Sequence, residues 1–314
     1  MSLWHEISVN DMDGFAIGNA EYEEAGTGCT VILPKGRCVC GQSVSGGAPA
    51  SRESALLNPL AANDNVNAVL LSGGSAFGLN AAAGVVKYLE ERGIGFPTSS
   101  GPVPIVCASC IFDLGVGRAD IRPDEALGYQ ACLNAGNYKD GNHGAGTGAS
   151  VGKLLGPDHM TKSGIGSFAL QLGDLKIGAV VSVNAAGNVL GTDGKDMAGV
   201  RNENGSVMSG VDAMCLALSP RQMENTTICA VMTNASFDKT ACTKIAHMAD
   251  DGYARALNPV HTMYDGDTIY VMSSGDVRAD LNLVGTLSAL AVSEAICNAA
   301  RHAEDAYGIP AMRK

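Results

Sequence analysis

Short apolar runs alternate along the chain with longer segments in which apolar or small residues recur at helical spacing. The runs predict buried strands over 30–33, 66–71, 104–114, 228–233 and 268–272. The helical spacing predicts helices over 75–92, 124–135, 239–256 and 280–306. Two further runs, 167–172 and 177–184, are separated by Gly173-Asp174 and predict a β-hairpin. This order of elements predicts one α/β domain with helices on both sides of its sheets.

The strand over 228–233 begins just after the dipeptide Asn225-Thr226, and a polar, glycine-rich stretch over 191–224 precedes that dipeptide. Threonine is common where a strand begins, so a polar strand start explains the residue without any chemistry. A self-cleaving precursor would also place its nucleophile at such a junction. Cleavage between Asn225 and Thr226 would give Thr226 a free α-amine, which can act as the base for its hydroxyl. The dipeptide alone leaves both interpretations open.

Composition and charge narrow the classes of partner. The 314 residues are 46% hydrophobic and 17% charged, and 40 of them are glycines, which is typical of tight turns and close backbone packing. The net charge of −11 argues against a nucleic-acid partner, because phosphate binding needs clustered Lys and Arg. No apolar run approaches the ~20 residues that cross a bilayer, and no signal peptide is visible. We therefore expect no membrane partner and a cytoplasmic location.

The 10 cysteines lie mostly in apolar segments and show no secreted disulfide framework, which favours buried, reduced thiols. Cys107 and Cys110 have CxxC spacing. A second pair, or a histidine partner, would be needed for a zinc site, and neither is present. We expect no metal here.

Two glycine-rich segments come close to known motifs and fail at single positions. In 71–79, Phe77 stands where a nucleophile elbow needs glycine, and Gly73-Gly74 breaks the dinucleotide spacing. A structural turn, or a pair of backbone amide donors at a helix N-terminus, fits this segment better. The segment 144–153 lacks the glycine and the hydroxyl residue of a phosphate loop. It leaves Lys153 either as a surface lysine or as a positive charge for a site.

Three polar residues stand at strand ends. Asn184 ends the strand over 177–184, where its amide either satisfies the following turn or donates to an oxyanion. Asp265 and Asp267 flank Gly266 just before the strand over 268–272, where a turn is the simplest interpretation. None of these residues identifies a function by itself.

Taken in order, these segments resemble the self-processing L-aminopeptidase/D-amidase/D-esterase family, which includes β-aminopeptidases and nylon-oligomer hydrolases. The resemblance extends over nearly the whole chain. It is carried by 26–33, 46–49, 52–53, 71–79, 104–106, 112–115, 144–149, Lys153, 225–227, 259–263 and 265–267.

The resemblance implies a four-layer αββα sandwich, like that of N-terminal-nucleophile hydrolases but with different connectivity. It implies one catalytic domain over 1–314 that is cut between Asn225 and Thr226 into 1–225 and 226–314. Thr226 matches the nucleophile, and Asp265 and Asp267 match the pair that orients its amine. Asn184 matches an oxyanion donor. Lys153 matches a lysine near the nucleophile.

The resemblance also implies a small peptide or amide substrate, no metal or cofactor, and a homo-oligomer, with tetramers frequent in the family. The chemistry fits, because an α-amine has an unperturbed pKa of about 7.7–8.0 and can accept a proton at neutral pH. Two nearby carboxylates favour the protonated amine, so they must orient it without raising its pKa too far.

The match has departures. Several aminopeptidase members use serine with a Ser/Glu pair, so the Thr/Asp/Asp set here is closer to the nylon-oligomer hydrolases. Some members have a tyrosine near the segment 107–112, where this chain has Cys110 and Phe112, so the resemblance does not carry an oxyanion role to these positions.

Two other functions stay open. Ornithine acetyltransferases share the fold and cleave before a threonine, but their Lys-Gly-x-Gly-Met approach is absent from 221–225. A catalytically silent binding protein on the same scaffold is the second alternative.

Overall fold

The computed structural model describes residues 3–218 and 225–312. The approach to the predicted cleavage site over 219–224 lies outside the described residues, whereas Asn225 and Thr226 themselves are described.

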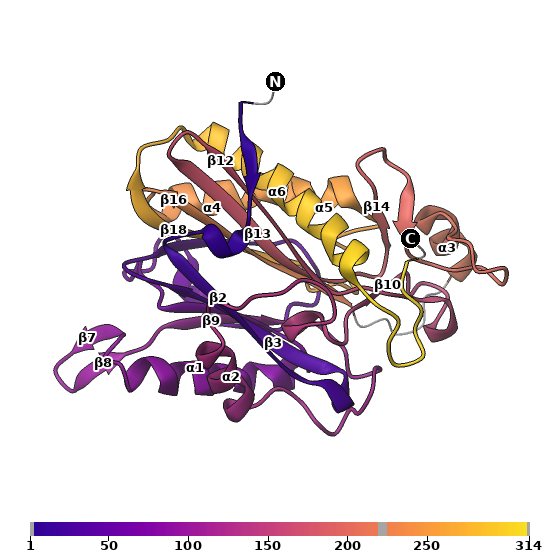
Figure 1. Cartoon of the computed structure of the whole chain (residues 1–314), viewed down its shortest axis with the longest axis horizontal. Helices are drawn as coiled ribbons and strands as arrows, with labels where there is room; N and C mark the ends of the chain where they lie inside the picture. The colour runs from indigo at the N-terminus through magenta and orange to yellow at the C-terminus, as the bar shows by residue number, and fades with distance from the viewer. Residues whose placement is uncertain (1–2, 219–224, 313–314) are drawn as a thin grey trace.

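Two sheets lie face to face and form the middle of the molecule (Figure 1). The larger sheet has the order β1 (His5–Ile7), β12 (Ile165–Leu172), β13 (Leu175–Asn184), β16 (Thr226–Ala235), β18 (Thr268–Val277) and β4 (Val39–Val44). The smaller sheet has the order β2 (Phe15–Tyr22), β3 (Thr27–Pro34), β6 (Ala68–Ser72), β9 (Val106–Cys110) and β5 (Ser51–Arg52). Only β16–β18 and β6–β9 are parallel among the described pairs of these two sheets.

Helices cover the outer face of each sheet. On the larger sheet lie α4 (Lys239–Ala249), α5 (Asp251–Ala256) and α6 (Leu281–His302), and on the smaller sheet lie α1 (Ala81–Glu90) and α2 (Glu125–Leu133). Small residues let these layers approach closely: a Cβ on Gly166 of β12 would lie 2.2 Å from the backbone of α6. The αββα sandwich that the resemblance implied is therefore confirmed (Figure 1).

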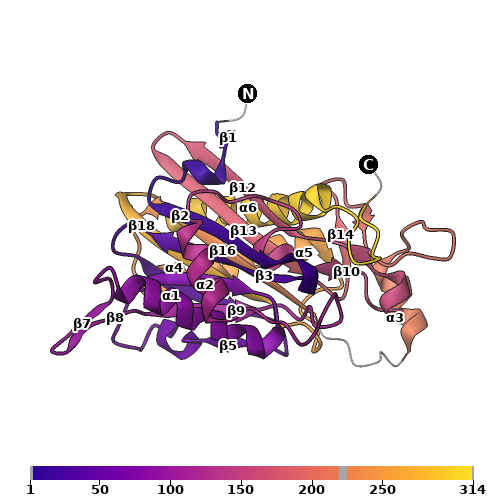
Figure 2. The ribbon, with the colours of Figure 1, turned by 60° about the horizontal axis from the view of Figure 1, so that its bottom comes forward.

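Smaller elements sit at the two ends of the sandwich. The hairpin β7 (Phe96–Thr98) and β8 (Gly101–Val103) projects at one end, and α3 (Gly210–Ala217) lies at the other (Figure 2). The remaining short strands are β10 (Ser150–Val151), β11 (Thr161–Lys162), β14 (Asn188–Leu190), β15 (Asp196–Ala198) and β17 (Leu257–Asn258).

The central strands are apolar on both faces because each face packs against a different layer. On β16, Ile228, Ala230 and Met232 belong to the core between the sheets, while Cys229 and Val231 belong to the core beneath the helices. Side chains alternate along a strand, so Thr226 lies on the same face as Ile228. The sequence of β16 therefore directs the Thr226 side chain between the two sheets.

Most predicted elements are present, with four differences. The helix predicted over 75–92 is a 3₁₀ helix over Ser75–Asn80 followed by α1. The helix predicted over 239–256 is divided at Asp250 into α4 and α5. β4 and β2 were missed, because their polar and glycine-containing sequences carry no continuous apolar run.

The fourth difference concerns α6. By length and composition, this described helix is apolar enough to cross a membrane, although no run of about 20 apolar residues was expected. Polar residues are spread among its alanines and leucines. Of its most apolar window, 72% is buried inside the protein, as in a core helix.

Candidate active site

Thr226 and Asn184 stand directly opposite each other at the edge of the larger sheet. The antiparallel register of β13 and β16 pairs them as the last partners of the ladder. Opposite residues of an antiparallel pair point to the same face, so both side chains enter the layer between the sheets. Both are buried.

The hydroxyl of Thr226 lies against the peptide bond that precedes it. Its Oγ1 donates a hydrogen bond to the carbonyl oxygen of Asn225. Gly266 passes so close that a Cβ built on it would lie 2.8 Å from this Oγ1. The Asn225 carboxamide is also buried, and neither of its polar atoms has a hydrogen-bond partner among the described residues.

Lys153 and Asn184 form one unit. The Lys153 Nζ donates to Oδ1 of Asn184 at 2.6 Å and to its backbone oxygen at 3.1 Å. Ser150 N donates to the same Oδ1 at 3.1 Å. The amide nitrogen of Asn184 donates to the Phe112 carbonyl at 2.9 Å, and an amide NH₂ carries a second N–H. Lys153 is thus held beside Asn184 rather than left on the surface.

Asp265 and Asp267 approach Thr226 from the loop before β18, and both are 1% exposed. Asp267 Oδ1 accepts the backbone N–H of Thr227 at 2.9 Å. Asp265 accepts the N–H of Ala186 at 3.2 Å and the hydroxyl of Thr262 at 2.5 Å. Burial and the charge of Asp267 raise the pKa of Asp265 to about 6. The loop is therefore more than a turn, since it puts two carboxylates on neighbours of Thr226 and Asn184.

The sequence analysis missed two members of this cluster, His261 and Asp250. The other oxygen of Asp267, Oδ2, contacts Nδ1 of His261 at 2.9 Å and the backbone N–H of His261 at 3.0 Å. Nε2 of His261 lies 3.5 Å from Asp250 Oδ2. His261 stands in the segment 259–263 that carried the resemblance, but its spacing to Asp267 has no motif of its own. Asp250 could not be found from sequence, because only the fold brings α4 to this loop.

A further buried carboxylate, Asp113, lies against the Gly73-Gly74 turn. Asp113 accepts hydrogen bonds from Thr27 Oγ1 and Gly74 N, both at 2.7 Å, and burial raises its pKa to about 6. The backbone N–H of Gly74 is thus used in a contact inside the protein, which agrees with the structural turn expected for Gly73-Gly74. Nearby, the fully buried Lys162 donates to the carbonyls of Gly146, Ala149 and Ser163.

The described cysteines do not add chemistry to this cluster. All are free and most are buried, and burial raises the pKa of the Cys110 thiol. Within the described ranges, no group of three or more His, Cys, Asp or Glu side chains could hold a metal ion.

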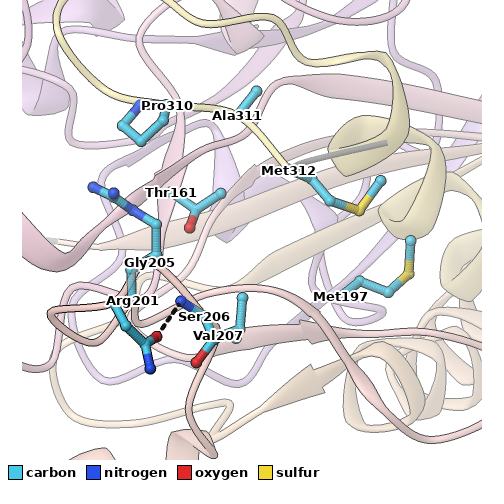
Figure 3. A pocket seen from close by; sticks show the side chains of 10 residues that line it. Thr161, Met197, Arg201, Gly205, Ser206, Val207, Pro310, Ala311 and Met312 are labelled. Atoms are coloured by element: carbon cyan, nitrogen blue, oxygen red, sulfur yellow. Dashed lines mark hydrogen bonds between the residues drawn. The ribbon is translucent and has the colours of Figure 1, made fainter.

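A separate pocket of about 390 Å³ lies between β11, the loop around Arg201 and the C-terminal segment (Figure 3). Pro310, Ala311 and Met312 line it together with Thr161 and Met197. The residues predicted for catalysis are not part of its described lining.

Comparisons with known proteins identify the family of the chain. The model of peptidase family S58 matches residues 8–313. An uncharacterised aminopeptidase of Mycobacterium tuberculosis is 35% identical over 341 residues, covering 98% of this chain and 97% of that protein. A 6-aminohexanoate-oligomer endohydrolase of Kocuria sp. is 31% identical over 280 residues, covering 85% of this chain and 75% of that protein.

Solved structures share the fold. A β-aminopeptidase of Burkholderia sp. superposes with a TM-score of 0.71 at 18% identity, covering 97% of this chain and 90% of its own. The L-aminopeptidase D-Ala-esterase/amidase of Ochrobactrum anthropi, described as a variant of the Ntn-hydrolase fold, gives 0.69 at 18% identity, covering 96% and 88%.

Proposed function

Because the chain belongs to peptidase family S58, and is therefore a hydrolase acting on amide bonds, we propose that it is a self-processing aminopeptidase or amidase with Thr226 as nucleophile. The precursor is cut between Asn225 and Thr226. The observation that carries the proposal is the contact of the Thr226 hydroxyl with the Asn225 carbonyl, inside a cluster of Asn184, Lys153 and two carboxylates.

In the maturation step, Thr226 Oγ1 attacks the carbonyl carbon of Asn225. The carbon–nitrogen bond breaks, the acyl group moves to Oγ1, and the nitrogen takes up the proton that the hydroxyl loses and becomes the free α-amine of Thr226. Water then hydrolyses the ester and releases the Asn225 carboxylate. The second N–H of the Asn184 amide and the charge of Lys153 stabilise the oxyanion. A good oxyanion donor contributes about 3 kcal/mol to such a step.

In the mature enzyme, the same hydroxyl attacks the carbonyl of a small peptide or other amide. The α-amine of Thr226 accepts the hydroxyl proton and returns it to the leaving amine, which contributes roughly 10²–10⁴ in rate. Asp265 and Asp267 orient the amine. The acyl-enzyme is an ester of Thr226, and water resolves it. Each step uses the Thr226 hydroxyl and amine, neighbouring side chains and water.

Intact-mass spectrometry of the purified protein tests the proposal. The wild-type protein should give two chains, one ending at Asn225 and one beginning at Thr226. Thr226→Ala should give one uncut chain of 32.1 kDa. Thr227→Ala is the matched control, because Thr227 is the adjacent buried threonine and its Oγ1 has no hydrogen-bond partner among the described residues. Cutting of Thr226→Ala at the same bond would disprove the assignment.

Product analysis distinguishes hydrolysis from acyl transfer. With an acyl donor and ornithine present together, a hydrolase releases the free acid, whereas an acyltransferase gives acylornithine. The absence of any turnover, together with an uncut chain, would favour a binding protein. A cytoplasmic location and a homo-oligomeric state stay predictions.

A further inference from the structure

The proposed mechanism has an electrostatic difficulty that the cluster itself addresses. The Thr226 amine must be neutral to accept a proton. However, Asp265 and Asp267 are buried, Gly266 between them approaches the Thr226 hydroxyl, and Asp267 accepts the N–H of Thr227. Each nearby negative charge favours the protonated amine, by 1–3 pKa units at about 4–6 Å. Without compensation, the amine would be a cation at neutral pH and could not act as base.

Positive charge is available on both sides of the carboxylate pair. Lys153 acts on Asp265 and lowers its pKa, which limits the effect of burial. On the other side, His261 contacts Asp267, which is the carboxylate bonded to the residue that follows Thr226. The imidazole is thus connected through one carboxylate to the residue that follows Thr226.

His261 is held between acidic groups. Asp267 contacts its Nδ1, Asp250 faces its Nε2, and Asp265 is the third carboxylate that acts on it. The ring of Tyr253 stacks at an angle, 5.8 Å between centroids. Asp250 in turn accepts the hydroxyl of Ser45. Burial lowers the pKa of His261, but the bond to Asp267 and the charges of Asp250 and Asp267 raise it above its ordinary value.

We propose that His261 is a positioning residue whose imidazolium offsets the charge of Asp267 and fixes its carboxylate, so that the Thr226 amine stays neutral at neutral pH. This inference rests on the proposed function. It assigns His261 no contact with substrate. His261 acts only on the mature enzyme, because the precursor has no free amine to tune.

The backbone supplies a suitable variant. His261 has φ of 56°, in the left-handed region that asparagine tolerates better than most residues. The amide of asparagine reaches the position of Nδ1 and can still donate to Asp267. His261→Asn therefore removes the charge while keeping the hydrogen bond and the local backbone.

The test is the pH dependence of kcat/KM between pH 5 and 10, measured with the aminoacyl p-nitroanilide that the wild-type enzyme hydrolyses fastest. In His261→Asn, the acidic limb should move up by about one pH unit, because an opposing charge has been lost. At pH 7 the rate should fall about two- to sixfold, as expected when a limb between about pH 6 and 7 moves up by one unit, and by pH 9 it should recover to nearly the wild-type value. KM should change little. The rate of sulfonylation of Thr226 by phenylmethylsulfonyl fluoride, followed by the mass of the β-chain, should shift in the same way.

His302→Asn is the matched control. His302 is also paired with a carboxylate, Asp140 at 3.3 Å, but at the end of α6. Its pH profile should equal that of the wild type.

An unchanged acidic limb in mature His261→Asn would overturn the inference, and so would an equal loss of rate at every pH. A folded His261→Asn chain that stays uncut would show that His261 acts in the maturation step, before the amine is formed. That result would also overturn the inference. If the asparagine variant fails to fold, His261→Gln replaces it. The proposed function fails separately, by cleavage of Thr226→Ala.

Discussion

Gly266 is the backbone position that most directly tests the geometry of the cleavage site. It lies between the two carboxylates, and its φ is not in the left-handed region. An alanine is therefore allowed by the backbone at this position, and only space opposes it. A Cβ there would lie 2.8 Å from Thr226 Oγ1, 2.7 Å from the Ala48 carbonyl and 3.1 Å from Pro49 Cα.

These distances set the expected size of the effect. Overpacking of this kind costs about 1–3 kcal/mol of stability. Two of the three atoms belong to the backbone, so the Thr226 side chain must yield first. Moving a reacting group by about 1 Å costs roughly 100-fold in rate. Gly266→Ala should thus fold, with a moderately lower Tm, and cut itself about 100 times more slowly than the wild type.

The assay is the time course of cleavage after expression, followed by intact mass, together with thermal unfolding. Gly95→Ala is the control, because a Cβ on Gly95 would lie 2.6–2.8 Å from the backbone near Val103, away from the cluster. It should lower the Tm as much and leave the rate of cleavage unchanged. A wild-type rate in Gly266→Ala would refute the placement of Gly266 against the reacting hydroxyl.

Further predictions concern buried polar groups. Lys162→Met and Lys239→Met each orphan three carbonyls. Both should lower the free energy of unfolding by about 2–4 kcal/mol in urea. Only Lys162→Met should slow cleavage, because Ser150, the strand partner of Lys162, donates to the predicted oxyanion donor Asn184. The raised pKa of Asp265 means that the folded state binds its proton up to about pH 6, so its stability contribution falls as pH rises from about 4 to 6. The free energy of unfolding of Asp265→Asn, measured across this pH range, should not show that fall, which is on the order of 3 kcal/mol in the wild type. Asn225→Leu removes an amide that has no hydrogen-bond partner among the described residues. By intact mass, this variant should still be cut before Thr226. By thermal unfolding, its uncut form should be about 1–3 kcal/mol more stable than the uncut form with Asn225.

The layers could be predicted from sequence because they depend on local patterns. The hairpin of β12 and β13 turns at Gly173-Asp174 as expected, since two apolar runs and a turn are all within 20 residues. The edge strands could not be predicted in this way. β4 contains Gly41, whose lack of a side chain admits the backbone of α4, and that requirement appears only when the helix is in place.

For the candidate site too, some features could be predicted from the sequence and others depend on the fold. Thr226, Asn184, Lys153, Asp265 and Asp267 could be named because an ordered resemblance assigned them. Their contacts depend on elements that are far apart in sequence, such as the pairing of Lys153 with Asn184. His261 had no signal of its own, because a histidine between two aspartates is defined by distance and not by spacing.

The register of one strand pair decides whether this chemistry is possible. Asn184 ends β13 and Thr226 begins β16, and they face each other on the side of the core between the sheets. A slip of one residue would turn Thr226 toward the helices and bring Thr227 into its place. The apolar residues of β16 prevent that slip, because Ile228, Ala230 and Met232 fill the space between the sheets while Cys229 and Val231 fill the space under the helices. The core therefore selects which of two adjacent threonines meets the carboxylates, and the position of the proposed nucleophile follows from packing before any catalytic residue is considered.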